Sequence, residues 1–533
     1  MPATFNERPH QNEKAETLAY VRALMEQARK DSKHEDLPKL EKIIELIDSK
    51  RYGLVWEEHA ELVEEEMKSK IPVFVEDESR KIKGNPASED YHFLLEGDNL
   101  HSLHLLEKTH AGKIDVIYID PPYNTGNKDF IYNDKIVDKN DGYSHSKWLS
   151  FMSKRLEIAQ NLLSKTGVIF ISIDDNEQAQ LKLLCDEVFG EENFIGEYIK
   201  QSKVGGGNDS KFIVKEHEFC LVYAKDISKT IPMYIQHSEN YLKRYKEEDG
   251  YGKYFWDTFA RPGLGLNSTL TYDIVAPDGT ILNTRWIRSK DRFEKEYKEG
   301  KVRIIQKKNG EWSIQFKQYL NNRGKTPRSF TMDFGGTTDG DKDIKNVFGK
   351  KVFNYPKSIK YISTLISTIL NKNATILDFF AGSGTTGHAV AQLNKEDGGK
   401  RKYILCTNNE NNICEEVTYQ RLSNIQGDLP HNLKYFKTQF IEKEDEDLEY
   451  ALLNNVKTLI ELEHAIDLEE SDKAVAFTLS EIRELDLTGI KTVYVRQHSH
   501  ALMGKEDRVR YEGIELVDVP EYYFAKEMKE AGL

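Results

Sequence analysis

Four consecutive residues, Asp120-Pro121-Pro122-Tyr123, combine groups that can bind a planar amine. The Asp120 carboxylate and the Pro121 carbonyl can accept hydrogen bonds from an –NH₂ group, and the Tyr123 ring offers a stacking face. Because prolines hold φ near about −65°, the pair Pro121-Pro122 keeps both flanking side chains in a rigid turn. A flipped-out nucleobase is a ligand of this kind. The alternative is a plain proline-stiffened turn, which we would favour if the tetrapeptide stood alone.

The elements around this turn predict where it lies. Residues 113–119 form an apolar run rich in β-branched side chains, which predicts a buried parallel strand. In open α/β sheets, ligands bind outside the carboxyl ends of the strands, where the turn would stand. Residues 124–130 predict a polar loop that could close over a substrate, with Phe130 as a second stacking face.

A second motif places a glycine-rich turn between a predicted strand and a predicted helix, at residues 376–390. The strand ends at Asp378, and the small residues Gly382 and Gly384 let the backbone turn tightly and approach a ligand. The motif has neither the full dinucleotide-binding glycine pattern nor a Walker lysine, so NAD or ATP phosphate binding fits poorly.

The next predicted strand, residues 401–407, brings Glu410 to its carboxyl end. An acidic residue one βαβ step from a glycine-rich turn can accept hydrogen bonds from ribose hydroxyls. The second motif therefore predicts a site for a cofactor that carries a ribose.

Together, these stretches resemble the S-adenosylmethionine-dependent amino-methyltransferases of DNA, in which D-P-P-Y is the catalytic motif and D-x-F-x-G-x-G binds the cofactor. The catalytic motif comes first in this chain, as in the permuted β group, whose members mostly make N6-methyladenine. Further local matches are residues 96–100, 217–225 and 353–357, although Ser358 stands where a second proline is common.

The resemblance implies an α/β fold: a permuted Rossmann-like methyltransferase sheet with an inserted DNA target-recognition domain and N- and C-terminal extensions. It implies that a flipped adenine stacks on Tyr123 while Asp120 and the Pro121 carbonyl bind the two N6 hydrogens. The implied S-adenosylmethionine site has Asp378, Phe379, Gly382 and Gly384 on the methionine side, Glu410 at the ribose and Asp98 at the adenine end. For Asp98, a turn-capping role is the alternative.

The tail after Leu448 and residues 52–57 look like the modification subunit of type III restriction–modification systems. This resemblance implies dimers that methylate one adenine of a short asymmetric site in double-stranded DNA and recruit a helicase-nuclease subunit. Three alternatives remain: methylation of cytosine N4, which has the same amine geometry, a solitary methyltransferase without a restriction partner, and a DNA-specificity subunit whose catalytic site has decayed. The intact Asp120, Tyr123 and Asp378 oppose the last of these.

The net charge of −14 argues at first against a nucleic-acid partner, but its distribution does not. Residues 225–360 carry 27 Lys and Arg against 17 Asp and Glu, and residues 285–328 carry 14 against 5, interleaved with aromatic side chains. Basic side chains neutralise phosphates, and arginine also reads guanine edges. A solvated charged face is the alternative. The candidate DNA-binding residues are Arg285, Arg288, Arg292 and Arg303.

A chain of 533 residues is too long for one core. We expect five regions: a helical N-terminal region (1–85), the catalytic half of the methyltransferase domain (86–228), the target-recognition domain (229–350), the cofactor-binding half (351–430) and a C-terminal oligomerisation or partner domain (431–533). Because the last region follows all the catalytic motifs and an acidic linker, we expect cofactor binding not to need it.

Four cysteines without metal-ligand spacing predict a reduced, cytoplasmic protein without structural zinc. Asp174 and Asp175, which end another predicted strand, are better explained as a helix cap than as metal ligands. No apolar run is long enough to span a bilayer, so we expect no membrane association. Residues 205–209 predict a mobile glycine-rich loop.

Overall fold

The computed structural model describes most of the chain: residues 13–31, 36–48, 56–127, 129–133, 135–138, 140–202, 212–264, 269–331, 334–519 and 521–532. The predicted glycine-rich loop at 205–209 and the stretch 52–55 lie outside these residues.

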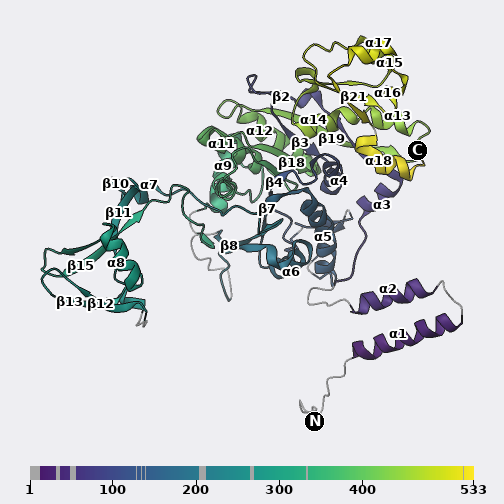
Figure 1. Ribbon diagram of the computed structural model, residues 1–533. Coiled ribbons are helices and arrows are strands. Elements are labelled where there is room, and N and C mark those ends of the chain that lie inside the picture. The colour runs from purple at the N-terminus through teal and green to yellow at the C-terminus, as the bar shows by residue number, and fades with distance from the viewer. Residues whose placement is uncertain are drawn as a thin grey trace.

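An 11-stranded mixed sheet forms the centre of the molecule (Figure 1). Strand β2 (Ile82–Lys83) pairs with β19, outside the main path. Along that path the order is β1 (Lys70–Glu76), β19 (Asn432–Glu442), β3 (Tyr91–Glu96), β18 (Lys402–Thr407), β17 (Thr375–Asp378), β4 (Ile114–Ile119), β7 (Leu163–Ile173), β9 (His217–Ala224), β8 (Phe194–Gln201) and β16 (Phe330–Thr331).

The two halves of the chain interleave in this sheet. Strand β17, from the second half, lies between β18 and β4 and runs parallel to both, with Ile376 opposite Val116 and Tyr403. Strands β3 and β7 are parallel to the same set, and β9 is antiparallel to β7. The carboxyl ends of β3, β18, β17 and β4 therefore meet at one edge, as expected for a permuted Rossmann-like α/β fold.

Helices cover both faces of the sheet because its central strands are apolar on both sides. In β4, Ile117 and Ile119 pack into one core cluster, while Val116 and Tyr118 pack into another. The first cluster includes α4 (Asn99–His110), α5 (Ser144–Leu162) and α6 (Gln178–Phe189). The second includes α10 (Ile359–Ser367), α11 (Thr385–Asp397) and α12 (Gln420–Asn424).

A smaller antiparallel domain projects from the large sheet (Figure 1). It has its own apolar core, which includes Phe259, Trp286 and Phe316. Its elements are α7 (Glu239–Leu242), the four-stranded sheet β10 (Glu247–Asp249), β11 (Gly252–Thr258), β15 (Trp312–Tyr319) and β14 (Val302–Gln306), the hairpin β12 (Thr271–Val275) and β13 (Ile281–Arg285), and α8 (Lys290–Lys298).

The insert ends earlier than predicted. The chain leaves the large sheet after β9 and returns at β16, which pairs with β8. The following helix α9 (Thr337–Phe348) contacts α12 of the large body. Residues 330–348, which we expected in the target-recognition domain, are therefore part of the methyltransferase body.

The sequence predicted a helical N-terminal region, but the structure shows that this region also contains a strand. Helices α1 (Glu13–Lys30), α2 (Leu37–Asp48) and α3 (Leu62–Ser69) are followed by β1, which pairs with β19 along seven residues. A short strand at the edge of a sheet gains its stability from its partner, and that partner comes from the other end of the chain.

The C-terminal region is likewise not a separable unit. Helices α13 (Leu448–Leu453), α14 (Val456–His464) and α18 (Glu521–Glu530) bury apolar side chains in the same core cluster as α4 and α5. The ammonium of Lys434 in β19 is fully buried beside Glu76 and Glu461, at 3.0 and 2.9 Å. Removing the tail would expose this core; the expectation that cofactor binding does not need the tail stays a prediction.

Part of the tail forms a smaller three-stranded sheet, which has an apolar cluster of its own but also contributes Tyr494 and Val519 to the main core. The parallel strands β20 (Lys473–Ala476), β21 (Thr492–Arg496) and β22 (Glu515–Val519) pack on a separate apolar cluster with α15 (Leu479–Glu484). Helices α16 (Ser499–Leu502) and α17 (Lys505–Arg510) complete it (Figure 1). None of the helices in the described part of the chain has the length and apolarity needed to cross a bilayer.

Candidate active site

The turn after β4 is held by its own side chains and by one buried indole. The Tyr123 hydroxyl donates to Asp120 Oδ1 at 2.8 Å. Trp148 of α5, which is fully buried, donates from Nε1 to the Pro122 carbonyl at 2.7 Å. Among the described residues, no donor contacts the Pro121 carbonyl. The turn is thus rigid at Pro122, while Pro121 keeps an acceptor for a ligand.

Lys357, to which the sequence assigned no role, lies directly on this turn. Its Nζ is 2.5 Å from the Tyr123 hydroxyl and 3.2 Å from Asp120 Oδ1. It also donates to Glu218 Oε2 at 2.8 Å. Glu218 and Lys357 belong to the stretches 217–225 and 353–357, so the signal was present in the sequence. Without the fold, nothing connected those stretches to Asp120.

Opposite charges offset the effect of burial in this cluster. Burial raises the pKa of Asp120 above its ordinary value, against the attraction of Lys357. Burial acts in the same direction on Glu218, but Lys357 and Lys200 prevail and lower the pKa of Glu218 to about 2. Burial opposes the charge on Lys357, yet Asp120 and Glu218 raise the pKa of its ammonium. Glu218 and Lys357 are therefore ionised at neutral pH.

The glycine-rich turn follows the neighbouring strand β17 and is organised by Asp378. One carboxylate oxygen accepts from the Phe380 N–H at 3.0 Å and the other from the Thr386 hydroxyl at 2.5 Å. Burial raises the pKa of Asp378 to about 7. Gly382 and Gly384 adopt φ of 48° and 73°, a left-handed conformation that other residues rarely tolerate. Asp378 therefore fixes the shape of the turn.

Two predicted cofactor residues also have structural contacts. The Phe379 ring is fully buried in the core, beside the Phe380 ring, and its carbonyl accepts from Asn99 Nδ2 at 2.8 Å. Asp98 caps α4 by accepting from the Leu100 N–H at 2.8 Å, which is the alternative role that its sequence position allowed. Glu410 is exposed just beyond β18, which pairs with the strand that precedes the glycine-rich turn.

A buried arginine joins these turns to the N-terminal segment. Arg155 of α5 donates from Nε to Asn99 Oδ1 at 2.6 Å and from Nη1 to both oxygens of Glu61, at 2.9 and 3.0 Å. Asn99 in turn holds the Phe379 carbonyl. A continuous set of hydrogen bonds therefore runs from Glu61 to the glycine-rich turn.

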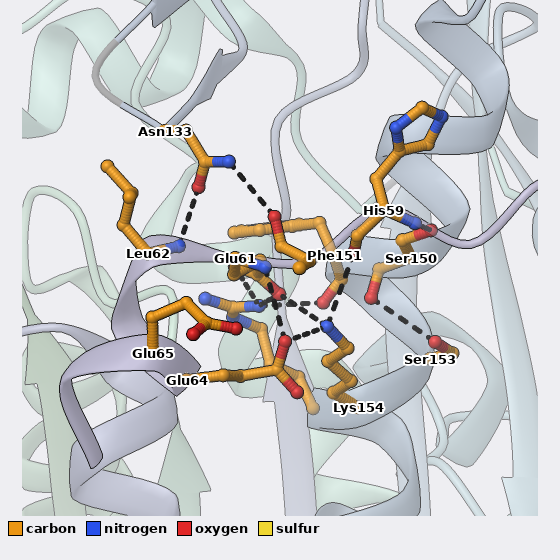
Figure 2. Close-up of polar contacts among 12 residues, drawn as sticks. His59, Glu61, Leu62, Glu64, Glu65, Asn133, Ser150, Phe151, Ser153 and Lys154 are labelled. Carbon is orange, nitrogen blue, oxygen red and sulfur yellow. Dashed lines mark hydrogen bonds and ion pairs between the residues drawn. The ribbon is translucent and has the colours of Figure 1, made fainter. Parts of the chain in front are cut away.

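The same N-terminal segment also holds the chain that follows the proline turn. Figure 2 shows Asn133, in the turn between β5 (Ile131–Tyr132) and β6 (Lys135–Ile136), accepting from the Leu62 N–H at 2.8 Å. His59 donates its N–H to Ser150 of α5 at 3.0 Å, and Glu64 pairs with Lys154. The sequence contained no signal for this support, because these contacts join distant parts of the chain.

A second buried carboxylate lies beside the loop after Tyr123. Glu177 is fully buried and accepts from Asn124 Nδ2 and His145 Nδ1, each at 2.6 Å. Asn124 has a φ of 56°, so this contact holds a left-handed residue next to the proline turn. Asp174 accepts from the Asn176 N–H at 2.8 Å and shapes the turn before α6, but the N-cap residue of that helix is Glu177, so the prediction that Asp174 or Asp175 caps it is wrong. Among the described residues, no group of three or more His, Cys, Asp and Glu side chains could hold a metal ion.

The candidate DNA-binding arginines lie in the insert, but most are engaged within it. Arg288 and Arg292 both pair with the carboxylate of Glu296. Arg303 donates to Gln315 Oε1 at 2.9 and 2.7 Å. Arg285 ends β13, where its carbonyl accepts from the Arg261 N–H. The side chain of Arg292 is 62% exposed and that of Arg288 only 20%, so Arg292 is better placed to contact a phosphate.

The geometry can be compared with known proteins. A family model described as DNA methylase matches residues 114–419, which include both turns and the insert between them. The chain belongs to this DNA methylase family.

The curated relatives of this DNA methylase fall into two groups. The type II methyltransferase M.KpnI from Klebsiella pneumoniae is 35% identical over 384 residues, which are 65% of this chain and 90% of that protein. The StyLTI Mod subunit of a type III restriction–modification enzyme from Salmonella typhimurium is 35% identical over 366 residues, 63% of this chain and 56% of that protein. The EcoPI Mod subunit from Escherichia phage P1 is 33% identical over 376 residues, covering 60% and 57%. The chain thus spans little more than half the length of the type III subunits.

Proposed function

We propose that this protein is a site-specific DNA methyltransferase that transfers a methyl group from S-adenosylmethionine to the N6 amine of adenine. The observation that carries the proposal is the adjacency of two turns. The Asp120 turn and the glycine-rich turn follow the neighbouring parallel strands β4 and β17 at one edge of the sheet. An amine bound at the first turn is therefore next to a cofactor bound at the second.

The residues present fit S-adenosylmethionine. Gly382 and Gly384 hold the backbone in a left-handed turn, and the exposed Glu410 carboxylate can accept from ribose hydroxyls. Asp378 contributes indirectly, because both its oxygens hold the turn. When bound, the cofactor supplies an electrophilic methyl group on a sulfonium, which is already a good leaving group.

The protein's own residues then bind and orient the base. Asp120 and the Pro121 carbonyl accept the two N6 hydrogens, which directs the nitrogen lone pair toward the cofactor. Tyr123 stacks on the flipped base. Phe130 is fully buried in the core, which makes it a poor second stacking face in this conformation. Positioning and electrostatics are therefore the main sources of rate.

We further propose that the protein is the modification subunit of a type III system, a homodimer that acts on double-stranded DNA with a helicase-nuclease partner. The names of the StyLTI and EcoPI relatives support this proposal. The match to M.KpnI, which covers 90% of that type II methyltransferase, favours a second candidate, a methyltransferase without an obligate restriction partner. A reducing, cytoplasmic location agrees with four buried free cysteines.

Single-molecule sequencing of host DNA with and without the gene tests the proposal. We expect N6-methyladenine at one short asymmetric motif, on one strand, only when the gene is present. N4-methylcytosine at the motif would correct the target base, and identical modification in both samples would contradict the proposed function. Capture of a helicase-nuclease encoded beside the gene separates the two candidate systems.

A further inference from the structure

Four charged side chains that come from four different elements meet at the proline turn. Lys357 contacts Asp120 and Glu218, and Lys200 of β8 lies 3.7 Å from Glu218 Oε2. The side chain of Lys357 is 11% exposed and that of Lys200 only 3%. The two acids and two bases sum to zero charge, which a weakly solvated site requires.

The Lys357 ammonium contacts the same groups that we propose bind the target amine. It lies within hydrogen-bonding distance of Asp120 Oδ1 and of the Tyr123 hydroxyl, and its Nζ is 4.9 Å from the centre of the Tyr123 ring. Like an –NH₂ group, it is a nitrogen that donates hydrogen atoms. The carboxylate and the aromatic ring proposed to bind the base are therefore both in contact with this lysine.

Buried ion pairs are often only structural, and that is the plain explanation of the cluster. Glu218 distinguishes this case. It holds the same ammonium at 2.8 Å, closer than Asp120 at 3.2 Å, so Lys357 keeps a charged partner if it leaves Asp120. An ammonium with a second acceptor can be displaced without becoming an unpaired buried charge.

The backbone around Lys357 is fixed, so only the side chain needs to move. Ser358 caps α10 by accepting from the Tyr361 N–H at 3.2 Å, and the Lys357 carbonyl accepts from the Thr385 hydroxyl at the same distance. Thr385 begins the helix after the glycine-rich turn. A flexible four-carbon side chain on a rigid base suits a group that changes partners.

We propose that Lys357 is a placeholder for the target amine, which binds Asp120 and Tyr123 in the empty site and moves fully onto Glu218 when the base enters. The inference rests on the proposed function in one respect, because it takes Asp120 and Tyr123 as the groups that bind the amine. It makes Lys357 a competitor of the substrate and Glu218 the residue that relieves the competition.

Two substitutions with opposite expected effects test the inference. Lys357→Met removes the competing ammonium and keeps the length of the side chain, so the amine should bind more tightly. Glu218→Gln weakens the second acceptor, so Lys357 stays on Asp120 and the amine should bind less tightly. A merely structural cluster would lose binding in both variants, because each change unbalances its charge.

The probe is adenosine, measured by ligand-detected NMR on the full-length protein with saturating S-adenosylhomocysteine to fill the cofactor site. Inosine, which lacks the amine, is the matched ligand. We expect Lys357→Met to bind adenosine about tenfold more tightly, the equivalent of one charge-assisted hydrogen bond, and Glu218→Gln to bind it more weakly. Inosine binding should change in neither variant. Lys360→Met, an exposed lysine on α10, is the matched control.

Weaker or unchanged adenosine binding in Lys357→Met would overturn the inference, as would the same shift for inosine or no detectable adenosine binding in any variant. The proposed function is tested separately, by transfer of tritium from methyl-labelled S-adenosylmethionine to DNA of a host that lacks the gene. If methyl transfer fails but adenosine binding changes as expected in the two variants, the proposed function alone is wrong. If methyl transfer occurs but adenosine binding does not change as expected, the placeholder role of Lys357 alone is wrong.

Discussion

Arg155 donates two hydrogen bonds to Glu61, at 2.9 and 3.0 Å, from a guanidinium that is fully buried in α5. Burial raises the pKa of Glu61, against the attraction of Arg155. Through Asn99, the same arginine reaches the carbonyl of Phe379 at the start of the glycine-rich turn. A segment that precedes every methyltransferase motif thus supports the proposed cofactor site.

Replacing Glu61 with Gln should destabilise the protein and weaken cofactor binding. The variant leaves the buried Arg155 with Asp98, at 3.3 Å and partly exposed, as its carboxylate partner, which we expect to lower the free energy of unfolding by about 3 kcal/mol in urea titrations. The KM for the cofactor should rise more than kcat falls, because the turn shifts while Asp120 does not. Glu65→Gln is the control: its side chain is 51% exposed, so its pair with Lys68 contributes little. Equal effects of the two changes would contradict the positioning role.

Asp120→Ala should abolish methyl transfer and leave cofactor binding largely intact. The carboxylate contacts the target amine in the proposed mechanism, so its loss should lower kcat by at least about a hundredfold. Isothermal titration calorimetry with S-adenosylhomocysteine measures the second property. Parallel loss of both activities would show that Asp120 serves the cofactor instead.

Tyr123 should tolerate loss of its hydroxyl better than loss of its ring. Tyr123→Phe removes the hydrogen bonds to Asp120 and from Lys357, and we expect methyl transfer to fall by less than about tenfold. Tyr123→Ala removes the stacking face and should lose most activity. Single-turnover methyl transfer compares the two variants, and similar rates would disprove the stacking role.

As the pH falls, methyl transfer should be lost at a higher pH than it would be if Asp120 had the pKa of an ordinary aspartate. Burial raises the pKa of Asp120, so its carboxylate takes up a proton earlier as the pH falls and stops accepting from the amine. Lys357 lowers this pKa and Glu218 raises it, while the Tyr123 hydroxyl stabilises the carboxylate. In Lys357→Met, the acidic limb of kcat/KM should therefore move to higher pH. A limb that stays in place or moves to lower pH would contradict this assignment.

Substituting two arginines of the insert should have different effects: we expect Arg292 to contact DNA and Arg288 to stabilise the insert. Arg292→Ala should weaken DNA binding and lower the slope of log K against log salt by about one, with the insert still folded. Arg288→Ala should instead destabilise the insert by about 2 kcal/mol, because Arg288 holds Glu296 and packs on Phe316. Fluorescence anisotropy on a DNA duplex and thermal unfolding separate the effects. A salt slope unchanged by Arg292→Ala would move the DNA contacts elsewhere.

The sequence by itself determined the local chemistry of both turns. Consecutive prolines after an apolar β-branched run dictate a rigid turn at a strand end, and Gly382 and Gly384 mark backbone that adopts a left-handed conformation. The order of the motifs, through the resemblance to the permuted methyltransferases, also predicted the permuted sheet. The shape of each turn depends on neighbouring residues, whose covalent geometry restricts the backbone wherever they occur.

Only the tertiary structure decided which distant side chains meet. It brought Lys357 and Glu218 to Asp120, Arg155 to Glu61, and β19 to β1. It also placed the Phe379 ring in the core and paired Arg288 with Glu296. The physical reason is the same in each case. A contact between residues far apart in the chain depends on how the whole sheet packs, so the local sequence around either partner does not predict it.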